Sequence, residues 1–264
     1  MKAKRYFFIP FLLVCSVAAF ISGVPSESHA QENEAVSLLK TMSDYLSSQS
    51  NIELEFDSDI EVITPQLEKL QFASSGVILL RRPDKLRAHR VAGHADAWLF
   101  FDGKIASVYS RSLNGYARFE VPGSVDQLIE TLRKGHGVAL PGADLLLSNS
   151  FDALMTDVLE AKHIGRGVID GVQCEHLAFR NFDTDWQVWV EVGQKPIPRK
   201  LVITSKTING APQYTLRVRK WNTASMPGRD SFAFTPPDGA RELDPNALIE
   251  LDELPQGAAP GGKQ

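Results

Sequence analysis

A cysteine and a histidine two residues apart are the first candidates for chemistry in this chain. Cys174 and His176 fall in the run VQCEHLAFR, and residues i and i+2 of a strand share a face with α-carbons about 7 Å apart. A thiolate activated by an imidazole needs those two groups near each other. A cysteine on a strand is, however, usually a small buried apolar residue, and no third group in the sequence orients the histidine. The sequence therefore favours a protein without catalytic residues and keeps a Cys174/His176 hydrolase as the alternative.

Other catalytic and cofactor motifs are missing from the sequence. It contains no G-x-S-x-G and no H-E-x-x-H, and Gly103-Lys104 lacks the upstream glycine and the following Ser or Thr of a phosphate loop. Gly165-Arg166-Gly167 with Gly171 misses the dinucleotide spacing by one residue. These glycines also follow a predicted helix, whereas a dinucleotide motif follows a strand, so they are interpreted as a connector. We expect no cofactor.

Two groups of charged residues each have an alternative interpretation. Asp183 and Asp185 are candidates for calcium ligands, but an acidic hairpin tip is usually solvated and the six to eight oxygens of a calcium site are not visible; we expect no metal. Five basic residues fall within ten positions, where they suit lipid headgroups or an acidic partner, or else a solvated sheet face. These residues are Arg81, Arg82, Lys85, Arg87 and Arg90.

The elements that position these residues are mostly strands. Residues 172–204 read as three strands joined by an acidic turn and a proline turn, with period-two alternation through Trp186, Val188 and Val190. Further strands are predicted at 52–62, 67–81, 85–91, 97–101, 105–110, 116–121, 214–218 and 232–234. The sequence thus predicts an α+β fold with about ten antiparallel strands in one large sheet, which curves as its twist accumulates.

Three amphipathic helices are expected to cover the concave face of that sheet. Apolar residues at i, i+3, i+4 and i+7 spacing predict the first helix over 35–46. Ser124 and Gln127 form a capping-box pattern that begins a short second helix ending near Gly135. Apolar spacing from Phe151 onward predicts a third helix that ends near Gly165 and carries His163 in its last turn.

The two ends of the chain lie outside the predicted domain. Three basic residues precede an apolar run from Phe7 to Ile21, and Ser28-His29-Ala30 suits a signal peptidase. The run is about 15 residues, shorter than the roughly 20 of a membrane-spanning helix. We therefore predict a cleaved signal peptide over 1–30, a single domain over 31–254 and a disordered tail over 255–264. The mature chain is then periplasmic and has no stable membrane anchor.

Charge and cysteine count exclude some partners of the mature chain. Removal of residues 1–30 takes away three of the 28 basic residues and one of the 32 acidic residues, which leaves a net charge of −6. An acidic exported chain is a poor candidate for binding nucleic acid or an anionic membrane. Cys174 is its only cysteine, so no internal disulfide can form. The core must hold together by burial of apolar surface.

Several segments resemble an uncharacterised family of bacterial predicted periplasmic proteins. They are GVILLRRPDKLRA (76–88), PGADLLL (141–147), DGVQCEHLAFR (170–180), DWQVWVE (185–191) and PIPRKLVIT (196–204). That family is similar in fold to the periplasmic lipoprotein carrier and the outer-membrane lipoprotein receptor. The resemblance implies an unclosed antiparallel half-barrel with a helical lid over a hydrophobic cavity. Those carriers hold the lid with a cavity arginine, and no motif in this chain places that arginine.

The resulting functional prediction is a periplasmic carrier or binding protein for a lipid or another hydrophobic ligand, held between sheet and helices. The alternative is a protein-interaction or envelope-sensor module that uses the same half-barrel to bind an envelope protein. The aromatic residues of the strands are either core or cavity lining. We expect one continuous apolar face to line the pocket, with Trp98, Phe100, Trp186, Val188, Val190, Tyr214 and Leu216 as ligand-binding residues.

Overall fold

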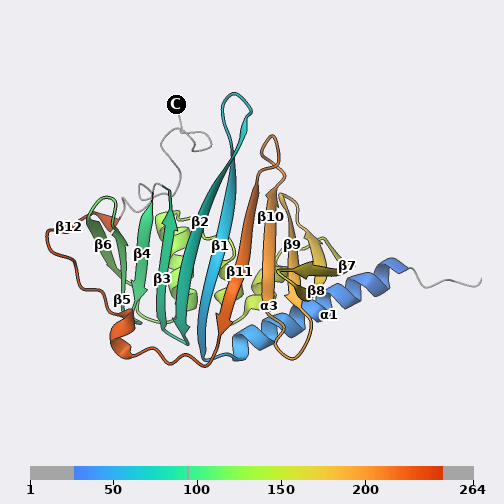
Figure 1. Ribbon diagram of the computed structural model, residues 1–264, viewed down its shortest axis with the longest axis horizontal. Helices are drawn as coiled ribbons and strands as arrows, with labels where there is room; N and C mark the ends of the chain where they lie inside the picture. The colour runs from blue at the N-terminus through green and yellow to red at the C-terminus, as the bar shows by residue number, and fades with distance from the viewer. Residues whose placement is uncertain (1–26, 94, 246–264) are drawn as a thin grey trace, which may run out of the picture.

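One twelve-stranded sheet organises the described part of the chain. The computed structural model describes residues 27–93 and 95–245. The predicted signal peptide over 1–30 lies mostly outside these residues, and the predicted tail over 255–264 lies entirely outside them. The strand order is β12-β6-β5-β4-β3-β2-β1-β11-β10-β9-β8-β7, and the sheet curves so that its two ends bend toward the helices (Figure 1). The predicted α+β half-barrel is confirmed.

Neighbouring strands are antiparallel, except that β12 is parallel to β6. The first group of strands is β1 Asn51–Ile63, β2 Lys69–Arg81, β3 Lys85–Ala92, β4 Asp96–Phe101, β5 Ile105–Ser110 and β6 Gly115–Glu120. The second group is β7 Glu160–Ile169, β8 Val172–Arg180, β9 Thr184–Glu191, β10 Pro198–Ser205 and β11 Gln213–Asn222, followed by the short β12 Arg241–Glu242. The pairing of β1 with β11 joins the two groups.

The helices lie against one face of this sheet, which we call the inner face. The α-helices are α1 Glu27–Ser48, α2 Val125–Glu130 and α3 Ser150–Met155, with a π-helical turn η1 Thr131–Gly135 and a 3-10 turn η2 Ala143–Leu146. A further 3-10 turn, η3 Arg229–Phe232, lies against the opposite face. The predicted capping box is present: the Gln127 backbone N–H donates to Ser124 Oγ, and the Ser124 backbone N–H donates to Gln127 Oε1. Helix α1 contacts β7, β8 and β9 at one end of the sheet (Figure 1).

Alternation along each strand divides its side chains between the inner and outer faces. In β1, Ile52, Leu54 and Phe56 are buried on the inner face, and the residues between them are acidic and point outward. The inner apolar residues form two core clusters rather than one. The first lies under α2 and includes Leu80, Leu86, Phe101 and Leu128, and the second lies under α1 and includes Leu39, Met42, Leu177 and Val188.

The predicted helix through residues 151–165 is wrong beyond Met155. Helix α3 ends there, Asp157 adopts a left-handed conformation with φ of 57°, and the chain then enters β7. A residue with positive φ cannot continue an α-helix. Pairing with β8 and cover from α1 stabilise the following residues as a strand. His163 and the glycines at 165 and 167, which were interpreted as helix end and connector, therefore lie on β7.

The segment after β11 crosses the outer face of the first group of strands, and we call residues 223–245 the C-terminal strap. Figure 1 shows it running below β1 to β4 before it rises to β12 at the far edge. The predicted strand at 232–234 is wrong, because η3 occupies 229–232 and the next residues pair with no strand. Phe232 is instead fully buried against the outer face. A buried phenylalanine is compatible with a strand and with a 3-10 turn, so the apolar pattern of residues 232–234 did not distinguish the two.

Candidate functional site

The inner face between the two core clusters is the candidate binding site, which we call the trough. Leu216 and Trp221 of β11 contact both clusters, yet both remain half-buried. Ile78, Ile203 and Tyr214 on neighbouring strands are half-buried as well. The cover formed by the helices is therefore incomplete along the central strands. A largely apolar surface that stays partly exposed suits a hydrophobic ligand.

Polar side chains lie on the trough beside this apolar surface. Ser58 and Ser74 face each other across β1 and β2 with 2.8 Å between their hydroxyl oxygens. Burial raises the pKa of the Tyr214 phenol, while a hydrogen bond with Ser58 and the charge of Arg90 oppose that rise. Arg90 has the same parity on β3 as the buried Leu86, so its side chain belongs to the inner face. This parity was visible in the sequence, but the five basic residues were interpreted there as one group.

A close backbone approach shapes the trough next to Arg90. Gly76 pairs with both Phe56 and Arg90, and a Cβ at this position would lie 2.4 Å from the Phe56 ring. Real Cβ atoms essentially never approach a ring atom so closely, so a larger residue would displace Phe56. Glycine allows the ring to lie flat across β2.

The predicted residues Trp186, Val188 and Val190 lie on the inner face, but α1 covers them. Val188 is fully buried, Trp186 is 7% exposed and stacks on Phe179 with 4.0 Å between ring centroids. The side chains of α1 that belong to the same cluster are themselves fully buried. These three residues thus form the floor beneath α1, whereas the predicted residues Tyr214 and Leu216 lie in the half-open trough.

Trp98 and Phe100 do not share that face. Leu99 and Phe101 pair with Ala88 and Leu86 and pack into the first core cluster, which places Trp98 and Phe100 on the outer face. The predicted continuous face is therefore wrong for these two residues. The run Trp98-Leu99-Phe100-Phe101 is apolar at both parities, so alternation does not decide which side faces inward.

On the outer face, Trp98 and Phe100 belong to an aromatic cluster that the C-terminal strap covers. Trp98 stacks on His89 at 3.7 Å and lies 5.7 Å from Phe100, which in turn contacts Phe234 at 5.3 Å, all between ring centroids. A cavity of about 400 Å³ lies between this face and the strap, lined in part by Phe100, Phe232 and Phe234. It is a surface cavity on the side opposite the helices.

The five basic residues from 81 to 90 make different contacts on different sides of the sheet. Arg81 lies over the Phe232 ring at 5.2 Å, and Arg87 donates to the Ser231 carbonyl at 3.4 Å, so both hold the C-terminal strap. Lys85 bonds Asp84 at 2.8 Å. Arg82 reaches the helical side and donates to the Leu147 carbonyl at 3.5 Å. With Arg90 on the inner face, the group does not form one basic surface.

Polar contacts also hold the segment that covers the trough. Arg133 makes a two-pronged ion pair with Asp144 at 2.6 and 3.0 Å and donates to the Leu140 carbonyl at 2.9 Å. Asp126 on α2 accepts a hydrogen bond from the Ser148 backbone N–H at 3.0 Å. Burial lowers the pKa of Arg82, and the nearby Asp126 carboxylate partly opposes this. The cover therefore rests on a few charged contacts as well as on apolar packing.

Cys174 and His176 each contact other groups. Cys174 is fully buried, and burial raises the pKa of its thiol, with the Arg199 charge opposing this. The His176 Nε2 atom lies 2.9 Å from Gln187 Oε1, and the ring stacks on Trp189 with 4.1 Å between centroids. The thiolate that a nucleophilic cysteine needs is thus disfavoured, and the histidine is engaged elsewhere.

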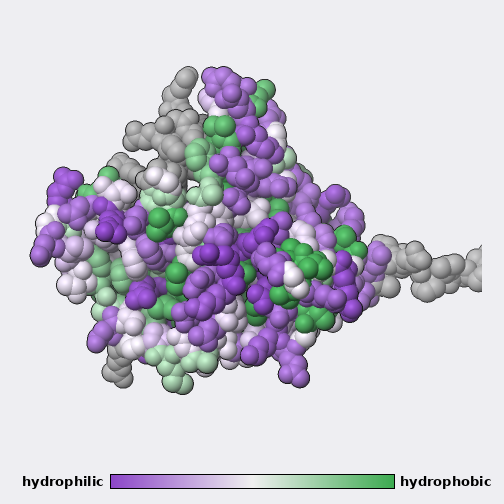
Figure 2. Space-filling model, viewed as in Figure 1, coloured by the Kyte–Doolittle hydropathy of each residue, from purple (hydrophilic) through white to green (hydrophobic). Residues whose placement is uncertain are grey.

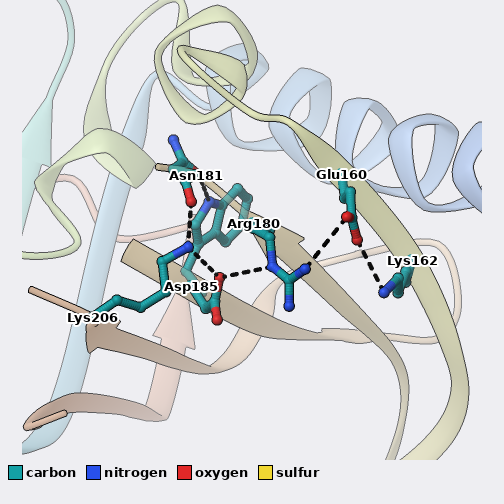
Figure 3. A network of polar contacts seen from close by, with 7 residues as sticks. Glu160, Lys162, Arg180, Asn181, Asp185 and Lys206 are labelled. Carbon is teal, nitrogen blue, oxygen red and sulfur yellow. Dashed lines mark hydrogen bonds and ion pairs between the residues drawn. The ribbon is translucent and has the colours of Figure 1, made fainter. Parts of the chain in front are cut away.

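The acidic hairpin between β8 and β9 belongs to a network of ion pairs. Asp185 contacts Lys206 at 3.0 Å and Arg180 at 3.5 Å, and Arg180 continues to Glu160 at 3.3 Å (Figure 3). Lys206 also donates to the Asn181 carbonyl. The Asp185 carboxylate is therefore already paired with Lys206 and Arg180. The described residues contain no group of three or more histidine, cysteine or acidic side chains that could hold a metal ion.

Within residues 27–93 and 95–245, none of the helices has the length and apolar character needed to cross a membrane. The outer face of the sheet is hydrophilic over its central strands (Figure 2). There the acidic row of β1 meets basic residues of β11, with Lys220 3.0 Å from Glu55 and Arg219 3.1 Å from Asp57.

Comparison with known proteins places these features in a family. No curated protein matches the chain. Among solved structures, LprF from Mycobacterium bovis is similar at 12% identity and a TM-score of 0.45, over 80% of this chain and 99% of that one. The Pseudomonas aeruginosa MucA/MucB complex is similar at 12% identity and a TM-score of 0.43, over 76% of this chain and 61% of that one.

A LolA superfamily protein from Nitrosomonas europaea is similar at 11% identity and a TM-score of 0.33, over 76% of this chain and 97% of that one. At these TM-scores, none of the three similarities says what the chain binds. The sequence itself matches one protein family over residues 35–244, from α1 to the end of the strap. The chain therefore belongs to the family described as "Predicted periplasmic protein (DUF2092)".

Proposed function

We propose that this chain is a periplasmic carrier or binding protein that holds a lipid or another hydrophobic ligand in the trough. The observation that carries the proposal is the half-buried inner face of the central strands, where Leu216 and Trp221 bridge two separate core clusters. A fold that needed this face only for stability would gain from covering it fully, since burying apolar surface contributes about 25 cal/mol per Å². Binding rather than catalysis also accords with the arrangement around Cys174 and His176.

The ligand that suits the trough is amphiphilic. Ile78, Ile203 and Leu216 offer apolar contact, while Arg90 and Tyr214 lie on the same inner face and carry polar groups. A hydrophobic tail with one polar or anionic head would match both parts. Trp186, Val188 and Val190 become accessible to such a ligand only if α1 moves, because α1 covers them.

Under the same proposal, the chain is exported by a signal peptide cleaved after Ala30 and folds as one domain over 31–254. The family match begins at residue 35, a few residues after the proposed cleavage site. The family description supports export, and the basic start and apolar run of residues 1–21 support the route.

Binding of an environment-sensitive hydrophobic dye tests the trough. Leu216→Asn places a polar amide on the trough floor and should weaken dye affinity about tenfold, since one well-buried apolar side chain is worth roughly 1.5 kcal/mol or more. Met226→Asn is the matched control, because Met226 is 86% exposed on the strap, away from the trough. Circular dichroism checks that both variants are folded. Absence of dye binding by the wild-type chain, or equal affinity in the two variants, would contradict the proposal.

A further inference from the structure

Exposed apolar side chains gather where the strands end on one side of the sheet, at the turns that join them. Eleven large apolar residues in the described chain are exposed, and seven of them lie at the end where β1 runs into β2. The antiparallel order explains the position, because the β1–β2, β5–β6, β8–β9 and β10–β11 turns must all lie at this end. Scattered exposed apolar residues are ordinary, but a gathering on successive turn tips needs a reason.

Contacts place the turns that carry five of these residues side by side, and we call these five residues the apolar rim. Gly210 in the β10–β11 turn lies against Ile63 at the end of β1. The Lys206 backbone N–H donates to the Asp183 carbonyl at 2.9 Å, and the Leu159 N–H donates to the Arg180 carbonyl at 2.7 Å. The turns are thus neighbours in space. The rim residues are Leu67 (70% exposed), Leu70 (42%), Leu159 (63%), Phe182 (87%) and Ile208 (38%).

Leu67 is the least expected member of the rim. Its φ is 65°, a left-handed conformation that favours glycine or asparagine and that strains a leucine. The β1–β2 hairpin that carries it rises above its neighbours (Figure 1), and hydrophobic surface is visible at its tip (Figure 2). Because the side chain is 70% exposed, burial compensates little for this strain, which favours a role of Leu67 in an interaction.

The backbone and the charges of the rim suit entry into a lipid interface. Two of the turn N–H groups are bonded within their own turns: Leu67 donates to the Thr64 carbonyl and Ala211 to the Ile208 carbonyl, both at 2.9 Å. An apolar medium therefore meets neither of these two amides unpaired. The nearby lysines are neutralised, with Lys69 3.0 Å from Glu61 and Lys206 3.0 Å from Asp185. Separate tips without a common groove fit between lipids better than against a folded protein.

We propose that the apolar rim docks this protein on the surface of a zwitterionic lipid bilayer, with Leu67 and Phe182 as the leading contacts. The docking is reversible and shallow, because the rim inserts turn tips and no helix. It does not depend on what fills the trough, so it is measured without ligand transfer. The neutralised lysines predict that anionic lipid is not required.

Sedimentation of the full chain with pure phosphatidylcholine vesicles tests this proposal. The double variant Leu67→Asn/Phe182→Ser should bind vesicles at least tenfold more weakly than the wild-type chain. Asparagine tolerates the left-handed conformation, so the fold should be retained. Val192→Ser/Met226→Ser is the matched control, because it removes two exposed apolar side chains that are not on the rim and should leave binding unchanged.

A fluorescent label locates the contact. A polarity-sensitive dye on Phe182→Cys should shift to the blue with vesicles, whereas the same dye on Met226→Cys should not; the wild-type chain, labelled in parallel, gives the background. Equal vesicle binding by the two double variants, binding that needs anionic lipid and disappears at high salt, or absence of any blue shift would overturn the proposal. Loss of a co-purifying envelope protein from the rim variant, with vesicle binding intact, would also overturn it in favour of a protein partner.

Discussion

Cys174 is a packing residue in this structure. It is fully buried on β8, and burial raises the pKa of its thiol. Cys174→Ala should therefore lower the free energy of unfolding by roughly 1 to 2 kcal/mol, as expected for a small buried group, and should leave dye binding unchanged. Chemical denaturation of the two proteins measures the difference. A variant of wild-type stability that had lost all binding would instead assign the thiol a functional role.

At the level of single residues, the sequence identified the apolar residues of the strands but did not always predict on which face of the sheet they lie. It singled out Tyr214 and Leu216, which lie in the trough, because apolar residues on one parity of a strand share a face. The same reasoning misplaced Trp98 and Phe100, since both parities of their strand are apolar and only pairing with β3 decides the side. It also treated Arg90 as one of a surface group, although its parity matches the buried Leu86.

Among the elements, α1 and β7 share a titratable contact. His163 Nδ1 lies 3.0 Å from Glu34 on α1, and His163 Nε2 lies 2.9 Å from Glu175 on β8, which also bonds Arg166 at 3.0 Å. Both ring nitrogens can donate only in the protonated form. Burial lowers the pKa of His163, but the hydrogen bonds and charges of the two glutamates outweigh it, so the net pKa is raised above 6.5.

This raised pKa predicts how the stability of α1 on the sheet depends on pH. The stabilisation is fully present below the unfolded pKa of 6.5 and is lost as the pH rises through the higher folded pKa. Because Glu34 is largely exposed, the effect should be modest, on the order of 1 kcal/mol or less. His163→Gln should remove this part of the pH dependence, as measured by denaturation across a pH series. Lys40→Gln on the exposed side of α1 is the control, and the same pH dependence in His163→Gln would contradict the assignment.

The sequence also located most elements, and its errors have identifiable causes. The capping box of α2 and the alternation of β9 are local signals, and both elements form where they were expected. Strand β7 was missed because Phe151, Leu154 and Met155 begin a true helix whose pattern continues by chance past Asp157. The C-terminal strap was missed because long-range contacts hold it, such as the pairing of Glu242 with Tyr116.

For the whole molecule, the helices cover one face of the sheet, and the apolar residues of that face form two core clusters. The clusters meet at Leu216 and Trp221, which both remain partly exposed. The apolar rim lies at one end of the same sheet, where the central hairpin rises above its neighbours (Figure 1). A protein that takes a hydrophobic ligand from a membrane surface would use both the trough and the rim.

Native mass spectrometry of the chain, purified from the periplasm without detergent, tests the central claim most directly. We predict a folded species heavier than residues 31–264 by the mass of one lipid or similar hydrophobic molecule, which appears by itself in the organic extract. Leu216→Asn should lower the occupied fraction, and Met226→Asn should not. A native mass equal to that of the polypeptide alone, with nothing hydrophobic in the extract, would contradict a carrier function for the trough.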